Sequence, residues 1–459
     1  MEPIENSTAA TQVLGFNPMF YVCVMSNFNL PQLEACLARR PSDLVLVVSS
    51  DYRPAREGAE NLTALLEQEL PGIRIHRPDL TAQPDAPQLT GDDALNAQEW
   101  MTQVLKPFLD THRQGLGCWL NLTGGTKATS LAFSTAYPWT GLDYKPSGKN
   151  HLSSYQLNLE KAPGTHVFNS LGEQPLPSVS PQQVARIYNK AFKEKSPNHF
   201  RANPASLPLA KLIFSGLERQ DEGLVCLFNA LSRIWSEQRD KERFPQWQLP
   251  SLTLPLTDFL QQPDTPHTDL EKEPSATDMW LKNLEDAAPE VFFVREGSIT
   301  LPGNKANKFG KVFKSWLSGD WLEQLTGHWL QTHAGIPENA MTFGLQAGEE
   351  KAIDREREAD VLIHHKGKTY LIEVKADVAP GETPADAERQ LSSLQSRYGQ
   401  TETLLMVGPE FRQRLENIND WQGFKARCAY QKVRVCWDAK SLGETLDGSL
   451  KPQPTPKAL

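Results

Sequence analysis

Short apolar segments alternate with amphipathic ones in the first third of the chain. The spacing predicts strands at 20–26, 44–50, 73–76 and 117–122, and helices at 30–37, 55–70, 92–112 and 126–137. Strands that are apolar throughout are typical of a parallel sheet covered by helices on both faces. The pattern therefore predicts a Rossmann-like α/β domain, with antiparallel edge strands within 151–159.

The pattern changes twice further along the chain. Four prolines, Pro163, Pro175, Pro177 and Pro181, mark a linker. Residues 181–290 have mostly helical but irregular spacing, with a proline-rich loop at 249–274 and strand-like alternation at 291–301. We therefore expect a first domain at 1–163, a helical or irregular accessory region at 164–304, and a second α/β domain at 305–459.

The last part of the chain again combines strands and helices. The spacing predicts helices at 305–318 and 320–332 separated by Gly319, a helix at 384–398, and strands at 341–346, 359–364, 369–374, 403–407 and 433–437. The dipeptide Lys366-Gly367 lies between two of these strands and predicts a tight hairpin turn.

Composition narrows the class of protein. The 459 residues are 39% hydrophobic and 22% charged, as in ordinary globular proteins. The formal net charge of −9 excludes a basic, histone-like protein, although a local basic groove can still bind nucleic acid. Six cysteines without a CxxC pair argue against a thiolate zinc site and for a reducing compartment. Neither a membrane span nor a secretory signal is visible, so we expect a cytoplasmic protein without membrane contact.

The first motif that carries chemistry is the turn Thr123-Gly124-Gly125-Thr126-Lys127 between a strand and a helix. Glycines let backbone N–H groups approach a phosphate closely, and the N-terminus of the following helix attracts anions. Neither the P-loop nor the GxGxxG pattern is present, so ATP hydrolysis is not indicated. The segment is either a tight strand-to-helix turn with a capping threonine or a site for a phosphate-bearing ligand.

This turn after an apolar strand resembles the signature of CARF domains, the CRISPR-associated Rossmann-fold sensors, over residues 18–160. It is most similar to the subgroup fused to a restriction-type nuclease. The resemblance implies a homodimer that binds a cyclic oligoadenylate across the dimer interface, at the carboxyl ends of the strands. The implied ligand-binding residues are Ser26, Asn27, Ser50, Thr123, Gly124, Gly125, Thr126 and Lys127. Cyclic tetra-adenylate is the first choice, and rings of three or six nucleotides stay open.

The second motif lies on the predicted hairpin. Residues two apart on a strand face the same side, so Glu373 and Lys375 project together, with Asp360 on the neighbouring strand. Two carboxylates bind a hard divalent cation such as Mg²⁺ or Mn²⁺. Such a cation lowers the pKa of a bound water and stabilises charge on a scissile phosphate. A solvated pair of Glu373 and Lys375 is the alternative interpretation.

Asp360 followed by Glu373-x-Lys375 resembles the PD-(D/E)xK nuclease motif, although Ala359 stands where the family usually has proline. By the same resemblance, Glu323 matches the acidic residue of the preceding helix and Gln390 the polar residue of the following one. The implied metal ligands are Asp360, Glu373 and Glu323. Glu358 is an accessory carboxylate on the Asp360 face, and His364 and His365 are expected to be solvent-exposed beside the turn.

One further stretch bears on nucleic-acid binding. Lys308, Lys311 and Lys314 recur every third residue beside an apolar face that contains Trp316. They form either a solvated helix surface or a stripe that contacts phosphates. Trp316 and Trp321 are expected to be buried rather than to stack on bases.

Together the two motifs indicate a type III CRISPR ancillary effector: a metal-dependent endonuclease that a cyclic oligoadenylate activates. Its expected substrates are DNA, single-stranded or supercoiled, and also RNA. The alternative is a ligand-responsive transcription regulator without catalysis, with a winged helix in 181–300 that includes Gly297. A first domain that also degrades its own ligand is a third hypothesis, which no residue supports.

Overall fold

The computed structural model describes most of the chain. The described residues are 15–158, 168–188, 191–194, 206–228, 230, 252–255, 274–287, 293–295, 298–301, 316–348, 358–377 and 401–447. They form a mixed α/β structure with a seven-stranded sheet, a six-stranded sheet and a small three-stranded sheet.

The seven-stranded sheet has the order β3-β2-β1-β4-β5-β6-β7. Its strands are β1 (Asn17–Val24), β2 (Pro41–Val47), β3 (Arg74–His76), β4 (Gly117–Asn121), β5 (Gly141–Tyr144), β6 (His151–Leu157) and β7 (Phe168–Pro175). The first five strands pair in parallel, and β6 and β7 add antiparallel pairs at one edge. The predicted parallel sheet is confirmed, and β6 lies within 151–159, where an antiparallel edge was expected, whereas β5 and β7 are strands that the pattern missed.

Helices cover both faces of this sheet. They are α2 (Leu30–Arg39), α3 (Arg53–Glu69), α4 (Pro78–Thr81), α5 (Ala94–Trp100), the π-helical turn η1 (Met101–Leu105), α6 (Lys106–His112) and α7 (Lys127–Ala136). Alternation along β1 sends Tyr21 and Cys23 into the core under α2 and α3, and Phe20 and Val22 into the core under α5 to α7. The predicted helix at 92–112 is helical from 94 to 112, with the π-helical turn η1 directly before α6, where Pro107 has no N–H to donate to the preceding turn.

The first domain extends beyond residue 163, where the sequence pattern placed its end. Strand β7 belongs to the first sheet, and α8 (Pro181–Tyr188) packs against α3. Strand β8 (Ala191–Glu194) pairs with the six-stranded sheet instead. The predicted accessory region 164–304 therefore contributes one strand to each sheet, with α8 between them, because unpaired edge groups of both sheets accept an added strand.

The six-stranded sheet has the order β16-β15-β14-β13-β12-β8. Its other strands are β12 (Met341–Gly348), β13 (Glu358–His365), β14 (Lys368–Lys375), β15 (Thr401–Val407) and β16 (Val433–Cys436). β13 and β14 form the predicted antiparallel hairpin, and β15 and β16 continue in parallel. Lys366 (φ 50°) and Gly367 (φ 72°) make its turn in the left-handed region. Positive φ at both central residues is typical of the tightest hairpins.

Helices also pack on both faces of this sheet. They are α9 (Ser206–Glu218), α12 (Pro274–Ala287), α14 (Trp321–Thr332), α16 (Pro409–Asn417), α17 (Trp421–Tyr430) and α18 (Ala439–Leu446). One face is covered by α14 and α18, with α9 and α12 behind, and Trp316 and Trp321 are buried there as expected. On the other face, α16 and α17 cover β15 and β16, while α8 covers β12 to β14. The short π-helical turn η2 (Trp316–Asp320) before α14 is broken at Gly319, where the pattern predicted a separation.

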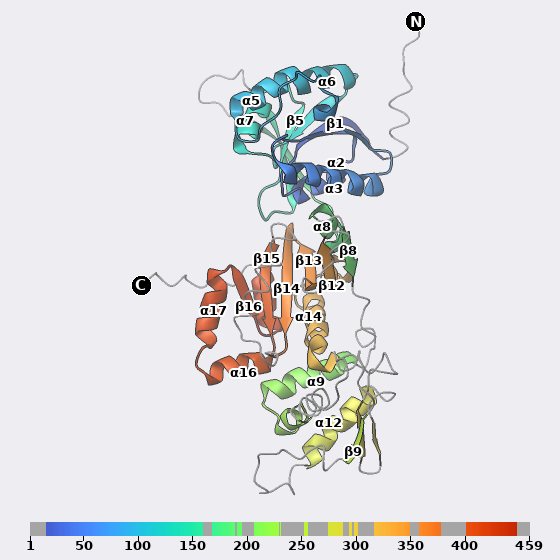
Figure 1. Ribbon diagram of the computed structural model, residues 1–459, viewed down its shortest axis with the longest axis vertical. Coiled ribbons are helices and arrows are strands. Elements are labelled where there is room, and N and C mark those ends of the chain that lie inside the picture. Colours follow the sequence, from blue (N-terminus) through green and yellow to red (C-terminus); the bar gives the residue numbers. More distant parts are fainter. Residues whose placement is uncertain are drawn as a thin grey trace.

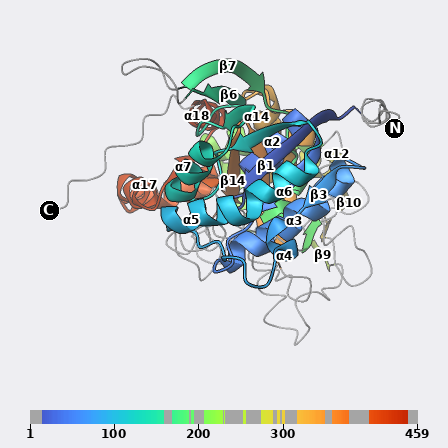
Figure 2. The same cartoon turned by 90° about the horizontal axis from the view of Figure 1, so that it is seen from above.

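The accessory region contains a third, small sheet of β9 (Leu252–Pro255), β10 (Phe293–Arg295) and β11 (Ser298–Leu301). Its strand β9 lies within the segment that the pattern predicted as a long loop. Figure 1 shows the first domain at the top, the six-stranded sheet below it, and α9, α12 and β9 at the bottom. Seen from above in Figure 2, β7 and β3 lie on opposite sides of the first domain with β1 between them. None of the helices in the described parts of the chain is long and apolar enough to cross a membrane.

Candidate functional sites

The first candidate site lies where the strand order of the seven-stranded sheet reverses. Strands β2 and β3 are added on one side of β1, and β4 and β5 are then added on its other side. Cys23 on β1 pairs with Asn121 on β4, so the loops after these strands leave the sheet side by side. Open α/β sheets bind ligands at this reversal, outside the carboxyl ends of the strands. The structure therefore brings Ser26-Asn27 and the turn 123–127 together.

Two glycines allow the second loop to approach the first. A Cβ added at Gly124 would lie 1.9 Å from the carbonyl oxygen of Val24, at the end of β1. Gly125 has φ +74° and would place a Cβ 2.5 Å from Cγ1 of Val24. Any side chain at either position would push the turn away from β1, so these glycines hold the two loops in contact.

The helix after the turn begins with a capped N-terminus. Thr126 is the N-cap of α7, and its Oγ1 accepts a hydrogen bond from the N–H of Thr129 at 3.2 Å. Lys127, the first residue of the helix, is exposed. Thr123 is held from the other side, because the N–H of Lys145 donates to its Oγ1 at 2.9 Å. The turn therefore presents backbone N–H groups and one exposed cation at a helix N-terminus, which is an arrangement that binds anions.

A third segment, which the sequence did not indicate, closes the same edge of the sheet. The hydroxyls of Thr126 and Thr129 donate to the carbonyl oxygen of Gly91, at 2.5 and 3.0 Å. The backbone N–H of Ser50 donates to the carbonyl oxygen of Leu89 at 2.9 Å. The segment around Leu89 and Gly91 thus links the loop after β2 to the turn after β4. No local signal marks it, since its role depends on carbonyl oxygens that every residue carries.

The loop after β1 is shaped by Asn29 rather than by the two residues predicted there. The Asn29 side chain accepts from the N–H of Ser26 at 2.9 Å and donates to its carbonyl oxygen at 2.7 Å. Asn29 is buried, and Gly58 on α3 leaves the space for its amide. Asn27 is exposed, while Ser26 and Ser50 are partly buried. These three side chains lie at the edge predicted for them, and Asn29 is the residue that orders the first loop.

The second candidate site lies at the end of the β13–β14 hairpin that is remote from its turn. Val361 pairs with Ile372, so Asp360 and Glu373 follow at the next position of the two strands. The Asp360 carboxylate accepts a hydrogen bond from the backbone N–H of Val374 at 2.7 Å. Nζ of Lys375 lies 2.9 Å from Oε1 of Glu373. The predicted residues Asp360, Glu373 and Lys375 are therefore brought together on adjacent strands.

Electrostatics at this site favour a positive charge. Burial, followed by the negative charge of Glu373, raises the pKa of Asp360 well above its ordinary value. Glu358 adds to the same effect, while Lys375 and the N–H of Val374 oppose it. Glu373 is buried, with 6% of its surface exposed, whereas Asp360 is partly open and the Lys375 side chain is 24% exposed. A cation from solvent can thus reach two crowded carboxylates that it would neutralise.

Glu323 lies in the first turn of α14, next to this end of the sheet. A Cβ added at Gly319, just before the helix, would lie 4.0 Å from Cβ of Ala376, the residue after Lys375. Among the residues that the structure describes, however, no group of three or more His, Cys, Asp and Glu side chains is arranged to hold a metal ion. The predicted three-carboxylate set of Glu323, Asp360 and Glu373 is therefore not assembled, whereas the pair of Asp360 and Glu373 is.

The donor set of that pair fits a small hard cation. Mg²⁺ is usually bound through one or two carboxylates, with water and substrate phosphates completing its coordination. Asp360 and Glu373 supply two carboxylates, the oxygen donors that such a cation prefers, at the end of the hairpin remote from its turn. Gln390 and the three lysines at 308, 311 and 314 lie outside the described residues.

The expectation for His364 is wrong. Its side chain is only 4% exposed, and its Nε2 lies 3.2 Å from Oε1 of Glu34 on α2 of the first domain. Its Nδ1 lies 3.0 Å from Oγ1 of Thr369 across the hairpin. A local pattern places a histidine beside a polar turn and predicts exposure, but the packing of the first domain on this turn buries it. His365 is partly buried, and this burial lowers its pKa.

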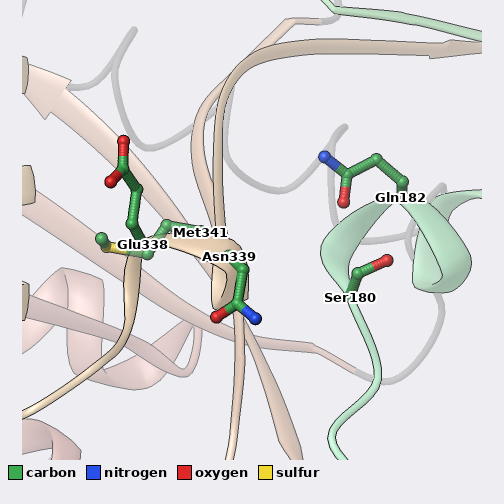
Figure 3. A pocket seen from close by; sticks show the side chains of 5 residues that line it. All are labelled: Ser180, Gln182, Glu338, Asn339 and Met341. Carbon is green, nitrogen blue, oxygen red and sulfur yellow. The ribbon is translucent and has the colours of Figure 1, made fainter.

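A groove also lies at the junction of the two domains, separate from both sites. It encloses about 720 Å³ and is lined by Ser180, Gln182, Glu338, Asn339 and Met341. In Figure 3, Ser180 and Gln182 lie on one side of it, and Glu338, Asn339 and Met341 lie on the other. None of the residues predicted for either site lines this groove.

The chain is similar in fold to solved structures along nearly its whole length, although it matches no protein-family model and no curated protein in sequence. A crystal structure of protein VC1899 from Vibrio cholerae has a TM-score of 0.62 at 14% identity, covering 94% of this chain and 97% of that one. The structure of Can2 from Sulfobacillus thermosulfidooxidans in complex with cyclic tetra-adenylate has a TM-score of 0.59 at 16% identity, covering 94% and 98%. Both domains and their order are thus shared with these proteins.

A more distant similarity is to a type III CRISPR defence DNA nuclease activated by cyclic oligoadenylate. Its TM-score is 0.44 at 17% identity, and the match covers 84% of this chain and 44% of that one.

Proposed function

We propose that this protein is a type III CRISPR effector whose first domain binds a cyclic oligoadenylate and whose last domain cuts nucleic acid with a divalent metal ion. One observation carries the proposal: a single chain contains two sites. The first is the turn 123–127, which is suited to binding phosphate and lies where the strand order of the sheet reverses. The second is the group of Asp360, Glu373 and Lys375. The fold shared with Can2, whose solved structure contains cyclic tetra-adenylate, supports it over 94% of the chain.

The ligand is proposed to occupy the edge formed by Ser26, Asn27, Ser50 and the turn 123–127. The phosphates of a cyclic oligoadenylate would lie against the N-terminus of α7 and the exposed amine of Lys127. Cyclic tetra-adenylate is the proposed ring. Two copies of the chain would enclose it, so the active form is proposed to be a homodimer.

The cutting site is proposed to lie at Asp360, Glu373 and Lys375. The two carboxylates would hold Mg²⁺ or Mn²⁺, and Glu323 and Gln390 are proposed to approach from the neighbouring helices. The bound cation would lower the pKa of a water and stabilise the charge that develops on the scissile phosphate. Lys375 places an ammonium beside Glu373, where it attracts the anionic backbone of the substrate and helps to neutralise the transition state.

The proposal is tested by a cleavage assay on the purified full-length chain. Supercoiled plasmid, single-stranded DNA and RNA are each incubated with Mn²⁺, with and without cyclic tetra-adenylate. The expected result is cutting of DNA, and also of RNA, only when both metal and ligand are present. Cutting that does not depend on the ligand would show that the first domain does not control the nuclease through ligand binding.

The same assay separates the competing function, a ligand-responsive DNA-binding regulator without catalysis. A regulator would shift DNA in a gel in the presence of the ligand and Mn²⁺ without breaking a strand. The two carboxylates beside a lysine favour the nuclease. Burying Glu373 next to Asp360 is electrostatically unfavourable, and a protein that only binds DNA has no use for this arrangement.

A further inference from the structure

Three buried charged or titratable side chains connect the two domains. Glu34 on α2 is fully buried, and Lys145 and His364 have side chains that are 6% and 4% exposed. Nζ of Lys145 forms an ion pair with Oε2 of Glu34, and Nε2 of His364 lies 3.2 Å from the other carboxylate oxygen. Each of the two oxygens of Glu34 therefore has its own partner, one from each domain.

Each member of this network is tied to one of the candidate sites. Glu34 lies on α2, the helix that begins directly after the loop Ser26–Asn29. Lys145 holds the other loop, because its backbone N–H donates to Oγ1 of Thr123 at 2.9 Å. Both loops of the proposed ligand site thus converge on one buried ion pair inside the first domain.

His364 continues the connection into the hairpin of the second site. Its Nδ1 lies 3.0 Å from Oγ1 of Thr369, and alternation along β14 puts Thr369 on the same face as Glu373 and Lys375. Thr369 and Glu373 are separated by four residues of one strand, about 13 Å at the rise of a β-strand. The strand is central in its sheet and paired on both sides, so a displacement at His364 moves the hairpin as a unit.

The surrounding backbone is packed closely at the same place. A Cβ added at Gly367, in the hairpin turn, would lie 2.6 Å from the carbonyl oxygen of Lys149. A Cβ added at Gly148 would lie 3.0 Å from Cε of Lys368. The loop after β5 therefore rests directly on the hairpin turn, without space that would absorb a movement of either part.

We propose that Glu34, Lys145 and His364 are positioning residues that transmit occupancy of the ligand loops to the Asp360–Glu373 hairpin. This inference rests on the proposed function. A buried charge that loses one partner is costly, so the network has few alternative arrangements and resists independent motion of the two domains. A ligand that displaces α2 or the Thr123 loop must then shift His364, and with it the hairpin.

The test measures coupling rather than activity. Allosteric coupling is reciprocal. If the ligand raises the affinity for substrate by some factor, substrate must raise the affinity for the ligand by the same factor. The affinity of cyclic tetra-adenylate is measured by calorimetry with and without single-stranded DNA, with Ca²⁺ in place of Mn²⁺ to limit cutting. In the unaltered chain we expect a factor in the range of about 5 to 150.

Two substitutions approach the network from different domains. Glu34→Gln keeps the shape of the side chain but removes its charge, and His364→Asn removes Nε2 while keeping a polar atom towards Thr369. We expect the coupling factor to fall below about 2 in each, with ligand binding retained in the absence of DNA. Hydrogen exchange of 358–377 is expected to respond to ligand in the unaltered chain and not in the variants.

The matched control is Asp43→Asn. Asp43 is also a buried carboxylate of the first domain, and its two basic partners, Arg74 and His76, lie on β3 and away from the hairpin. This variant is expected to be destabilised and yet to keep the full coupling factor.

Full coupling in His364→Asn would overturn the inference whether or not Glu34→Gln folds. Loss of coupling in Asp43→Asn to the same extent would overturn it too, because general destabilisation would then explain the effect. An unaltered chain that binds no ligand, or is not activated by it, would instead reject the proposed function.

Discussion

Nζ of Lys375 lies 2.9 Å from Oε1 of Glu373, two residues before it on the same strand. The contact confirms that both side chains leave β14 on one face, as the period of a strand requires. It places an ammonium beside a buried carboxylate at the open end of the hairpin, where Asp360 adds a second carboxylate. This juxtaposition of two carboxylates and a lysine is the chemical basis of the predictions about cutting.

Removing either carboxylate is expected to abolish cutting. Glu373→Gln and Asp360→Asn each remove a proposed metal ligand, and metal ions contribute several kcal/mol to stabilising such transition states. Cleavage rates should therefore fall by about 10²-fold or more, while the affinity for cyclic tetra-adenylate is unchanged. The measurements are plasmid cleavage with Mn²⁺ and ligand binding by calorimetry.

Glu402→Gln is the matched control. Glu402 lies on the adjacent strand β15, where it pairs with Lys368 and Arg434 towards the hairpin-turn end of the sheet. It should cut like the unaltered chain. Normal cutting by Asp360→Asn would show that the metal site is wrongly assigned.

Lys127→Ala is expected to weaken activation without affecting the chemistry. Lys127 is exposed at the start of α7, and a charge-assisted hydrogen bond to a phosphate contributes about 1.5–3 kcal/mol. The ligand concentration for half-maximal cutting should rise by about 10- to 100-fold, with the same maximal rate. Lys106→Ala, which breaks a surface pair with Asp110 on α6, should leave the activation curve in place. Identical curves for both variants would exclude Lys127 from the ligand site.

Gly124→Ala is expected to destabilise the first domain and to disturb the ligand loops. The added Cβ would lie 1.9 Å from the carbonyl oxygen of Val24, so β1 and the turn must separate. Overpacking of this kind costs about 1–3 kcal/mol, measured as the free energy of unfolding in urea. Gly443→Ala in α18, where no atom lies within 4 Å of the added Cβ, should instead stabilise the protein by about 0.5–1 kcal/mol. Equal effects of the two substitutions would contradict the close packing of Gly124.

Glu410 is expected to make stability depend on pH. Burial, and then the negative charge of Asp377, raises the pKa of Glu410 from 4.5 to about 7. Because the folded state holds this proton more tightly, the resulting stability is present below the unfolded pKa and is lost as pH rises through about 7. Glu410→Gln should therefore be more stable than the unaltered chain above neutrality, by about 1 kcal/mol for a partly exposed side chain.

Thermal unfolding at mildly acidic and mildly alkaline pH measures this difference. The control is Glu416→Gln on the same helix, which removes an exposed partner of Arg412 and should change stability by less than about 0.5 kcal/mol at either pH. A Glu410→Gln variant whose stability followed that of the unaltered chain at both pH values would show that Glu410 titrates normally.

The sequence determined most of the elements, because each depends on neighbours along the chain. The apolar runs predicted β1, β2 and β4, and the Lys366-Gly367 turn predicted the β13–β14 hairpin, since a two-residue turn with positive φ fixes the pairing of the strands that flank it. The spacing of Glu373 and Lys375 likewise predicted their shared face. Strand β5 was missed because its four residues include Gly141 and Asp143, and glycine and aspartate are depleted in strands.

Only the tertiary structure decided how distant segments combine. It placed residues 168–175 in the first sheet and 191–194 in the second, although the pattern predicted a linker for the former and mostly helical structure for the latter. It also buried His364 against Glu34, a residue 330 positions away in the chain. Local sequence propensity cannot predict such contacts. A polar side chain can be buried only where another residue provides a hydrogen-bond or ion-pair partner, and that residue can be distant in the sequence.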